Sequence, residues 1–135
     1  MIQLIFAGYI LLVIFLSLIP TAAIGAGMHS DKLAHFLAYG GMGFLAYISV
    51  QSRHKKVYLF IFIISLGVVL ELFQLYIPGR SASFFDIVAN TLGATMGYLV
   101  VWIVISGILN NSALKEELSS NNADADHSHN LEKVP

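Results

Sequence analysis

Polar and ionisable side chains occur at helical spacing inside apolar sequence. In the stretch DKLAHFLAY, Asp31, His35 and Tyr39 are four residues apart, so on a helix they share one face. Glu71 and Gln74, three residues apart, share a face of another apolar segment. A carboxylate near the centre of a bilayer costs about 2.5–3.5 kcal/mol on insertion scales. These residues therefore predict a site.

A third stretch, DIVANTLGATMG, combines polar and small residues on one face. Asp86, Asn90, Gly93 and Gly97 fall at relative positions 0, 4, 7 and 11, which form a narrow stripe on a helix. Gly93 and Gly97 make the small-xxx-small pattern that lets transmembrane backbones approach closely. This helix is expected to carry both a polar pair and a helix-packing seam.

The residue types suggest two kinds of chemistry. His35 with Glu71 or Asp86 could carry out acid–base catalysis or form a His-plus-carboxylate metal site. Arg80, and Lys32 next to Asp31, could bind an anion. No metal-ligand motif such as H-E-x-x-H and no serine nucleophile motif is present, so we predict neither a metal nor a cofactor. The candidate ligand-binding cluster is Asp31, Lys32, His35, Tyr39, Glu71, Gln74, Arg80, Asp86 and Asn90.

Composition indicates that a membrane holds these residues. Of the 135 residues, 57% are hydrophobic and 11% are charged, against about 25% charged in soluble domains. A net charge of −1 gives no reason to expect a nucleic-acid partner, and the absence of cysteine excludes disulfides and thiol chemistry. Four segments are long and apolar enough to span a bilayer, which predicts an all-α bundle of four transmembrane helices: 2–19, 33–50, 57–77 and 87–105.

The chain divides into a membrane domain, residues 1–109, and a polar, acidic tail, residues 110–135, for which we predict disorder. The first helix is almost entirely apolar and is interpreted as scaffold. The alternative, a cleaved signal peptide, is disfavoured because no Lys or Arg precedes an apolar run longer than the usual 7–15 residues.

The distribution of basic residues predicts the orientation. Arg53, Lys55, Lys56 and Lys115 lie on one side, against Lys32 and Arg80 on the other. The positive-inside rule then puts both termini in the cytoplasm and the polar cluster at the outer end of the bundle. At 1.5 Å rise per residue, Glu71 and Tyr39 would lie about 10–12 Å below the rim. We expect Glu71 and His35 to share a buried polar network.

The motifs resemble those of the VanZ-like family of small bacterial membrane proteins. D-K-x-x-H-F-x-x-Y, E-x-x-Q, P-x-R and D-x-x-x-N-x-x-G-x-x-x-G occur in order between Asp31 and Gly97. The resemblance implies a multi-pass protein of the bacterial cytoplasmic (inner) membrane and cell envelope. It also implies a role in antibiotic resistance of the teicoplanin type, and it assigns no catalytic residues.

Three functions are compatible with these patterns. The first is binding or transport of an anionic envelope lipid or cell-wall precursor, with membrane lipids and a lipid-linked or glycopeptide ligand as partners. The second is an intramembrane hydrolase or transferase that uses His35 and Glu71. The third is a structural membrane subunit whose polar residues bind a partner protein. Residue patterns do not predict the oligomeric state.

Overall fold

A computed structural model describes residues 1–19, 28–78, 80 and 82–131, and every regular element among them is an α-helix. The helices are α1 (Ile2–Leu18), α2 (Met28–Ser49), α3 (Arg53–Gln74) and α4 (Phe84–Leu131). Residues 1–101 form one compact unit, and residues 102–135 form a second. The all-helical class predicted from the sequence is confirmed.

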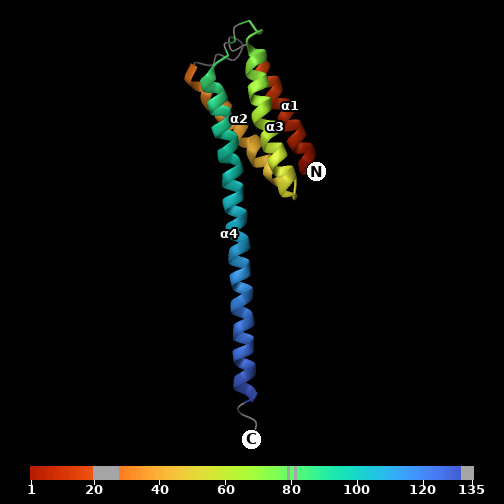
Figure 1. Cartoon of the computed structure of the whole chain (residues 1–135), viewed down its shortest axis with the longest axis vertical. Coiled ribbons are helices and arrows are strands. Elements are labelled where there is room, and N and C mark those ends of the chain that lie inside the picture. Colours follow the sequence, from red (N-terminus) through yellow and green to blue (C-terminus); the bar gives the residue numbers. More distant parts are fainter. Residues whose placement is uncertain (20–27, 79, 81, 132–135) are drawn as a thin grey trace. The chain divides into compact units, whose positions relative to one another are not determined.

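The first unit contains α1, α2, α3 and the beginning of α4 (Figure 1). The C-terminal end of α1, the N-terminal end of α2 and the connection between α3 and α4 lie at the same end of this unit. The helices are therefore antiparallel to their neighbours in sequence. This arrangement brings together the three stretches that carry the predicted site residues.

The boundaries of α2 and α3 differ from the predicted ones mainly at the N-terminal ends. α2 begins at Met28, five residues before the predicted start, because Asp31 is favourable in the first turn of a helix. α3 begins at Arg53, directly after its N-cap residue Ser52, and so includes the basic residues assigned to the turn. Asp31 and Lys32 thus belong to the helix that carries His35.

α4 continues through the segment for which the sequence predicts disorder, as far as Leu131. The run SALKEEL, residues 112–118, contains strong helix formers, which accounts for continuation of the helix past residue 110. The division of the chain near residue 110 stays a prediction, and the contacts place a boundary earlier, after Val101.

Among the described residues, two helical stretches are long and apolar enough to cross a membrane. They are α3 and the Phe84–Glu116 part of α4. α1 is apolar but has only 17 residues. Large apolar side chains cover the outside of the first unit, including Leu4, Leu37, Ile61 and Phe73, each more than half exposed. In water such a surface would be unfavourable, whereas lipid tails would cover it at no cost.

The core of the first unit is formed by apolar and aromatic side chains from all four helices. Its buried members are Phe6, Val13, Tyr39, Met42, Ala46, Ile63 and Ala94. Backbone contact between α2 and α4 is especially close. A Cβ atom built on Gly93 would collide with the carbonyl of Phe36, and one built on Gly97 would collide with the carbonyl of Gly40. The two predicted packing glycines therefore lie at a helix crossing.

Candidate functional site

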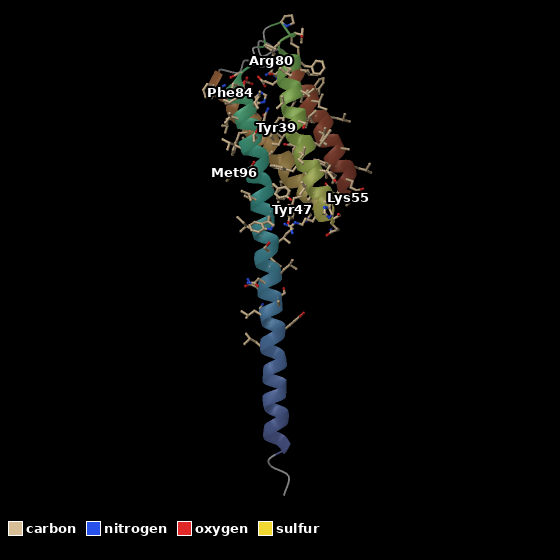
Figure 2. The ribbon with its side chains drawn as sticks, viewed as in Figure 1. Tyr39, Tyr47, Lys55, Arg80, Phe84 and Met96 are labelled. Atoms are coloured by element: carbon tan, nitrogen blue, oxygen red, sulfur yellow. The ribbon has the colours of Figure 1, made fainter. Side chains whose placement is uncertain are left out.

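The nine predicted site residues gather at the end of the first unit where α2 and α4 begin. Figure 2 shows Arg80 and Phe84 at this end, with Tyr39 below them and with Tyr47 and Lys55 at the opposite end. Six of the nine side chains are buried: His35, Tyr39, Glu71, Gln74, Asp86 and Asn90. Asp31, Lys32 and Arg80 are partly exposed as whole residues. We call these nine residues the polar cluster.

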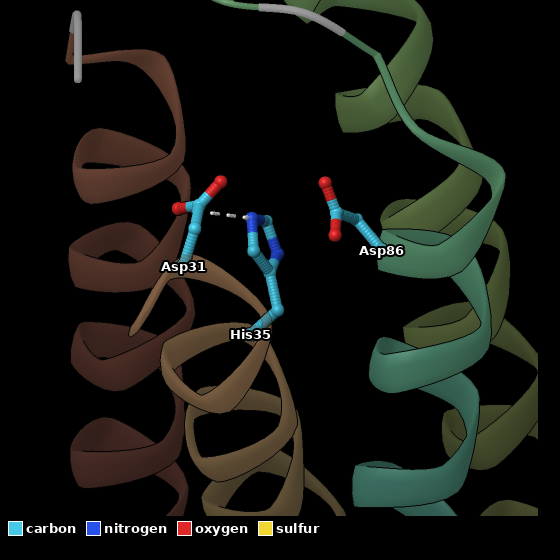
Figure 3. Close-up of side chains that lie close together, drawn as sticks. All are labelled: Asp31, His35 and Asp86. Carbon is cyan, nitrogen blue, oxygen red and sulfur yellow. Dashed lines mark ion pairs between the residues drawn. The ribbon is translucent and has the colours of Figure 1, made fainter. Parts of the chain in front are cut away.

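His35 is the central residue of the polar cluster. Its Nδ1 lies 3.0 Å from Oδ1 of Asn90, and its Nε2 lies 3.9 Å from Oδ1 of Asp31. Asp86, on α4, faces the imidazole from the other side (Figure 3). One ligand atom from each of Asp31, His35 and Asp86 lies within 4.8 Å of the others, a spacing at which the three side chains could hold a metal ion. The imidazole is thus placed between two carboxylates by residues from two helices.

Lys32 joins the beginning of α2 to the beginning of α4. Its Nζ donates to Oδ1 of Asp86 at 2.7 Å and to Oγ of Ser83 at 3.4 Å. The Asp86 side chain is only 4% exposed, whereas the Lys32 side chain is 35% exposed. The ammonium group also lies 5.9 Å from the centre of the Phe85 ring. Lys32 therefore neutralises a buried carboxylate while remaining accessible from outside the bundle.

Arg80 is bound by three groups of the chain itself. Its Nε donates to the carbonyl of Ile19 at 2.8 Å, and its Nη2 donates to that of Leu16 at 3.0 Å. Its Nη1 lies 3.4 Å from Oδ1 of Asp31, and the side chain is 5% exposed. A helix leaves its last carbonyls without intrahelical donors, and a cation is favourable there. Arg80 therefore caps α1 instead of presenting a free guanidinium at the rim.

Gln74 makes a second contact with the end of α1. Its Nε2 donates to the carbonyl of Ser17 at 2.9 Å, and both residues are buried. α1 contributes backbone carbonyl groups at residues 16, 17 and 19 that bind the side chains of Arg80 and Gln74. Residue types alone do not predict this role, because every residue has a backbone carbonyl group.

Glu71 meets the connection that precedes α4. Its Oε1 accepts a hydrogen bond of 2.5 Å from the backbone N–H of Ser83. The Glu71 side chain is buried, as are those of His35 and Asp86. Within the described part of the chain, no direct hydrogen bond joins Glu71 to His35: His35 pairs with Asn90, and Glu71 pairs with Ser83. Glu71 lies before the end of α3, and its carboxyl group nevertheless contacts the connection that leads to α4.

Two buried polar atoms of the polar cluster have no hydrogen-bond partner among the described residues. They are the hydroxyl oxygen of Tyr39 and Oε2 of Glu71. Leaving such an atom unpaired costs about 1–3 kcal/mol. Natural proteins rarely keep this cost without a ligand, an ordered water or a catalytic role. Tyr39 and Glu71 are therefore the members of the cluster with unused bonding capacity.

Comparison with known proteins assigns the chain to a family. The VanZ/LLP1 family model matches residues 5–105, a range that contains the whole polar cluster and most of the first unit. The chain belongs to the VanZ/LLP1 family. No curated protein and no solved structure matches it significantly.

Membership of the VanZ/LLP1 family makes the protein membrane-associated and confirms the predicted resemblance. In this family member, the two residues that bind the end of α1, Arg80 and Gln74, connect elements of the fold.

The ionisable residues of the polar cluster carry unequal numbers of negative and positive charges. Three carboxylates, Asp31, Glu71 and Asp86, stand against two cations, Lys32 and Arg80. The polar cluster is acidic overall when His35 is neutral.

Proposed function

We propose that this VanZ/LLP1 protein crosses the bacterial inner membrane four times and binds an anionic envelope lipid at the polar cluster. Both termini are cytoplasmic, and the cluster opens outward. Four spans require that α1 also crosses the bilayer, and its 17 residues are just long enough for a transmembrane helix. The side chains of Gln74 and Arg80 donate hydrogen bonds to carbonyl groups at the C-terminal end of α1 and so hold it near the beginnings of α2 and α4.

The observation that carries the lipid proposal is the position of Lys32. A lysine ammonium has three donors, and the contacts with Asp86 and Ser83 use two of them. The side chain is 35% exposed, so the third donor can reach a phosphate at the rim. The Phe85 ring lies 5.9 Å from the ammonium group and contacts the Phe84 ring, and these two strongly exposed rings can cover an acyl or polyprenyl chain. One accessible cation flanked by aromatic rings suits a lipid headgroup with its attached chain.

The proposed topology predicts which cysteine substitutions can be labelled from outside intact cells. The chain contains no cysteine, so each introduced thiol is the sole target. Ala82→Cys, at a partly exposed position in the connection before α4, should react with a membrane-impermeant maleimide. Ser52→Cys, between α2 and α3, should react only after the membrane is permeabilised. The opposite labelling pattern would contradict both the orientation and the outward opening of the polar cluster.

Lys32→Gln is expected to weaken binding of an anionic lipid about five- to tenfold, because a basic residue near lipid phosphate contributes about 1 kcal/mol. Native mass spectrometry of the purified protein, titrated with phosphatidylglycerol, measures this change. Binding of zwitterionic phosphatidylcholine should change less. Lys32→Arg keeps the charge and should restore most of the affinity.

The matched control is Lys55→Gln, which removes an exposed lysine from the opposite end of the first unit (Figure 2). It should leave phosphatidylglycerol binding at the wild-type value. Thermal unfolding of each variant separates lost binding from lost folding. Equal affinities in wild type and a folded Lys32→Gln variant would reject the lipid site. Release of a cleaved headgroup during the titration would instead establish the hydrolase alternative.

A role in resistance to glycopeptides follows from the same proposal. Teicoplanin carries a fatty acyl chain, and cell-wall precursors are lipid phosphates in the outer leaflet. A protein that binds such lipids at that leaflet is placed to alter access to the precursors. The support is the family match together with the accessible Lys32 and its neighbouring phenylalanines.

A further inference from the structure

We propose that Asp31, His35 and Asp86 form a binding site for a divalent transition-metal ion, with Glu71 as a further ligand. This inference is separate from lipid binding and does not rest on it. The sequence shows no metal motif because the ligands come from three helices, α2, α3 and α4, and only Asp31 and His35 are close in sequence.

Geometry is the first argument for the metal site. Two ligands of one ion with bonds of about 2.1 Å lie roughly 3 to 4 Å apart. The corresponding atoms of Asp31, His35 and Asp86 all lie within 4.8 Å of one another, and Nε2 of His35 is already 3.9 Å from Asp31. Small side-chain movements would bring all three onto one ion. Figure 3 shows the three side chains close together, with His35 between Asp31 and Asp86.

The hydrogen bond between His35 and Asn90 is the second argument. Oδ1 of Asn90 is an acceptor 3.0 Å from Nδ1, so in a neutral ring it favours the tautomer with the proton on Nδ1. That tautomer leaves the lone pair of Nε2, 3.9 Å from Asp31, for a metal ion. Metal-binding histidines usually donate their other ring N–H to an oxygen in this way. The buried amide of Asn90 thus presents Nε2 as a ligand.

Glu71 supplies an independent observation. It is 2% exposed, and its Oε2 has no hydrogen-bond partner among the described residues. Ser83 occupies the other carboxyl oxygen and thereby orients the group. A buried carboxyl oxygen without a hydrogen-bond partner has a lone pair that a bound cation could use.

The charges around the site also fit a divalent ion. Lys32 and Arg80 bind Asp86 and Asp31, and hydrogen bonds of this kind commonly orient ligating carboxylates. With His35 neutral, the three carboxylates exceed the two cations by one negative charge. A divalent ion would change the sum from −1 to +1. The mixture of one imidazole with carboxylates favours Zn²⁺ or Mn²⁺ over Ca²⁺ and Mg²⁺, which take oxygen ligands.

The test is Zn²⁺ titration of the full-length protein in detergent without added lipid, by calorimetry after treatment with a chelator. We expect one ion per chain to bind at this site. His35→Gln should lower the affinity about 100-fold, and Glu71→Gln should lower it by about tenfold. His54→Gln, an exposed histidine at the opposite end of the first unit, should leave it unchanged. The double variant His127→Gln/His129→Gln controls for weak binding by the tail.

Two further measurements test the metal site even if the His35→Gln variant does not fold. Visible absorption of the Co²⁺-loaded wild type should show bands of a fixed nitrogen–oxygen ligand set, and Asn90→Ala should alter these bands. Zn²⁺ should also raise the unfolding temperature of wild type and not that of Glu71→Gln. Absence of stoichiometric Zn²⁺ binding to wild type, or equal affinity in wild type and both ligand variants, would overturn the proposal.

Discussion

Arg80→Gln should lower the stability of the folded protein by about 1.5–3 kcal/mol, the usual contribution of hydrogen bonds to a charged group. The substitution removes the hydrogen bonds to the carbonyls of Leu16 and Ile19 and the ion pair with Asp31. Because the side chain is only 5% exposed, water does not readily replace these donors. Unfolding of the purified protein in detergent, followed by circular dichroism during denaturant titration, measures the loss.

Arg80→Lys tests the geometry of the cap separately from its charge. A lysine keeps the positive charge near Asp31, but a single ammonium group cannot reproduce the planar fork that reaches all three acceptors. Its stability should fall between wild type and Arg80→Gln. Arg53→Gln, an exposed arginine at the beginning of α3, should unfold like wild type. If Arg80→Gln also unfolded like wild type, the cap would contribute nothing to stability, and the guanidinium of Arg80 would be available for a ligand.

Gly97→Leu should separate α4 from α2 and lower stability by about 3 kcal/mol, at the upper end of the range for overpacked cores. The collision is with the backbone carbonyl of Gly40, which cannot rotate away as a side chain could. Relief requires movement of a whole helix, and this would also move Asp86 and Asn90 away from α2. The change should therefore weaken Zn²⁺ binding as well as stability, as measured by the calorimetric titration and by denaturant unfolding.

Gly8→Leu in α1 is the matched control, because a Cβ atom there meets nothing within 4 Å. It should unfold like wild type and bind Zn²⁺ equally well. The smaller change Gly97→Ala should already destabilise the protein, since the first added carbon atom causes the collision. Equal stability of Gly97→Leu and Gly8→Leu would show that the helix crossing is not tightly packed.

Much of the polar cluster could be predicted because helix periodicity directly relates sequence to position. The i, i+4 spacing of Asp31 and His35, and of Asp86 and Asn90, predicted the faces that meet in the structure. The same argument predicted the close approach at Gly93 and Gly97. These predictions needed only the helices themselves and the cost of placing polar groups in an apolar environment.

The contacts that escaped prediction involve backbone groups or pairing between helices. Arg80 binds carbonyls of α1 that carry no side-chain signal, so its expected role at the rim could not be distinguished from capping. Glu71 pairs with the backbone N–H of Ser83, a contact that depends on the path of the α3–α4 connection. Sequence spacing gives depth along a helix, but it does not give the direction in which a long side chain bends.

The cap of α1 also determines when this end of the first unit can be completed during synthesis. Arg80 follows its acceptor at Ile19 by 61 residues. At elongation rates of about 5–20 residues per second, this separation corresponds to a delay of roughly 3–12 s. During that interval, the last carbonyls of α1 depend on water or lipid headgroups for hydrogen-bond donors. α1 is therefore synthesised well before the residue that caps it, and its final position is set by the second half of the chain.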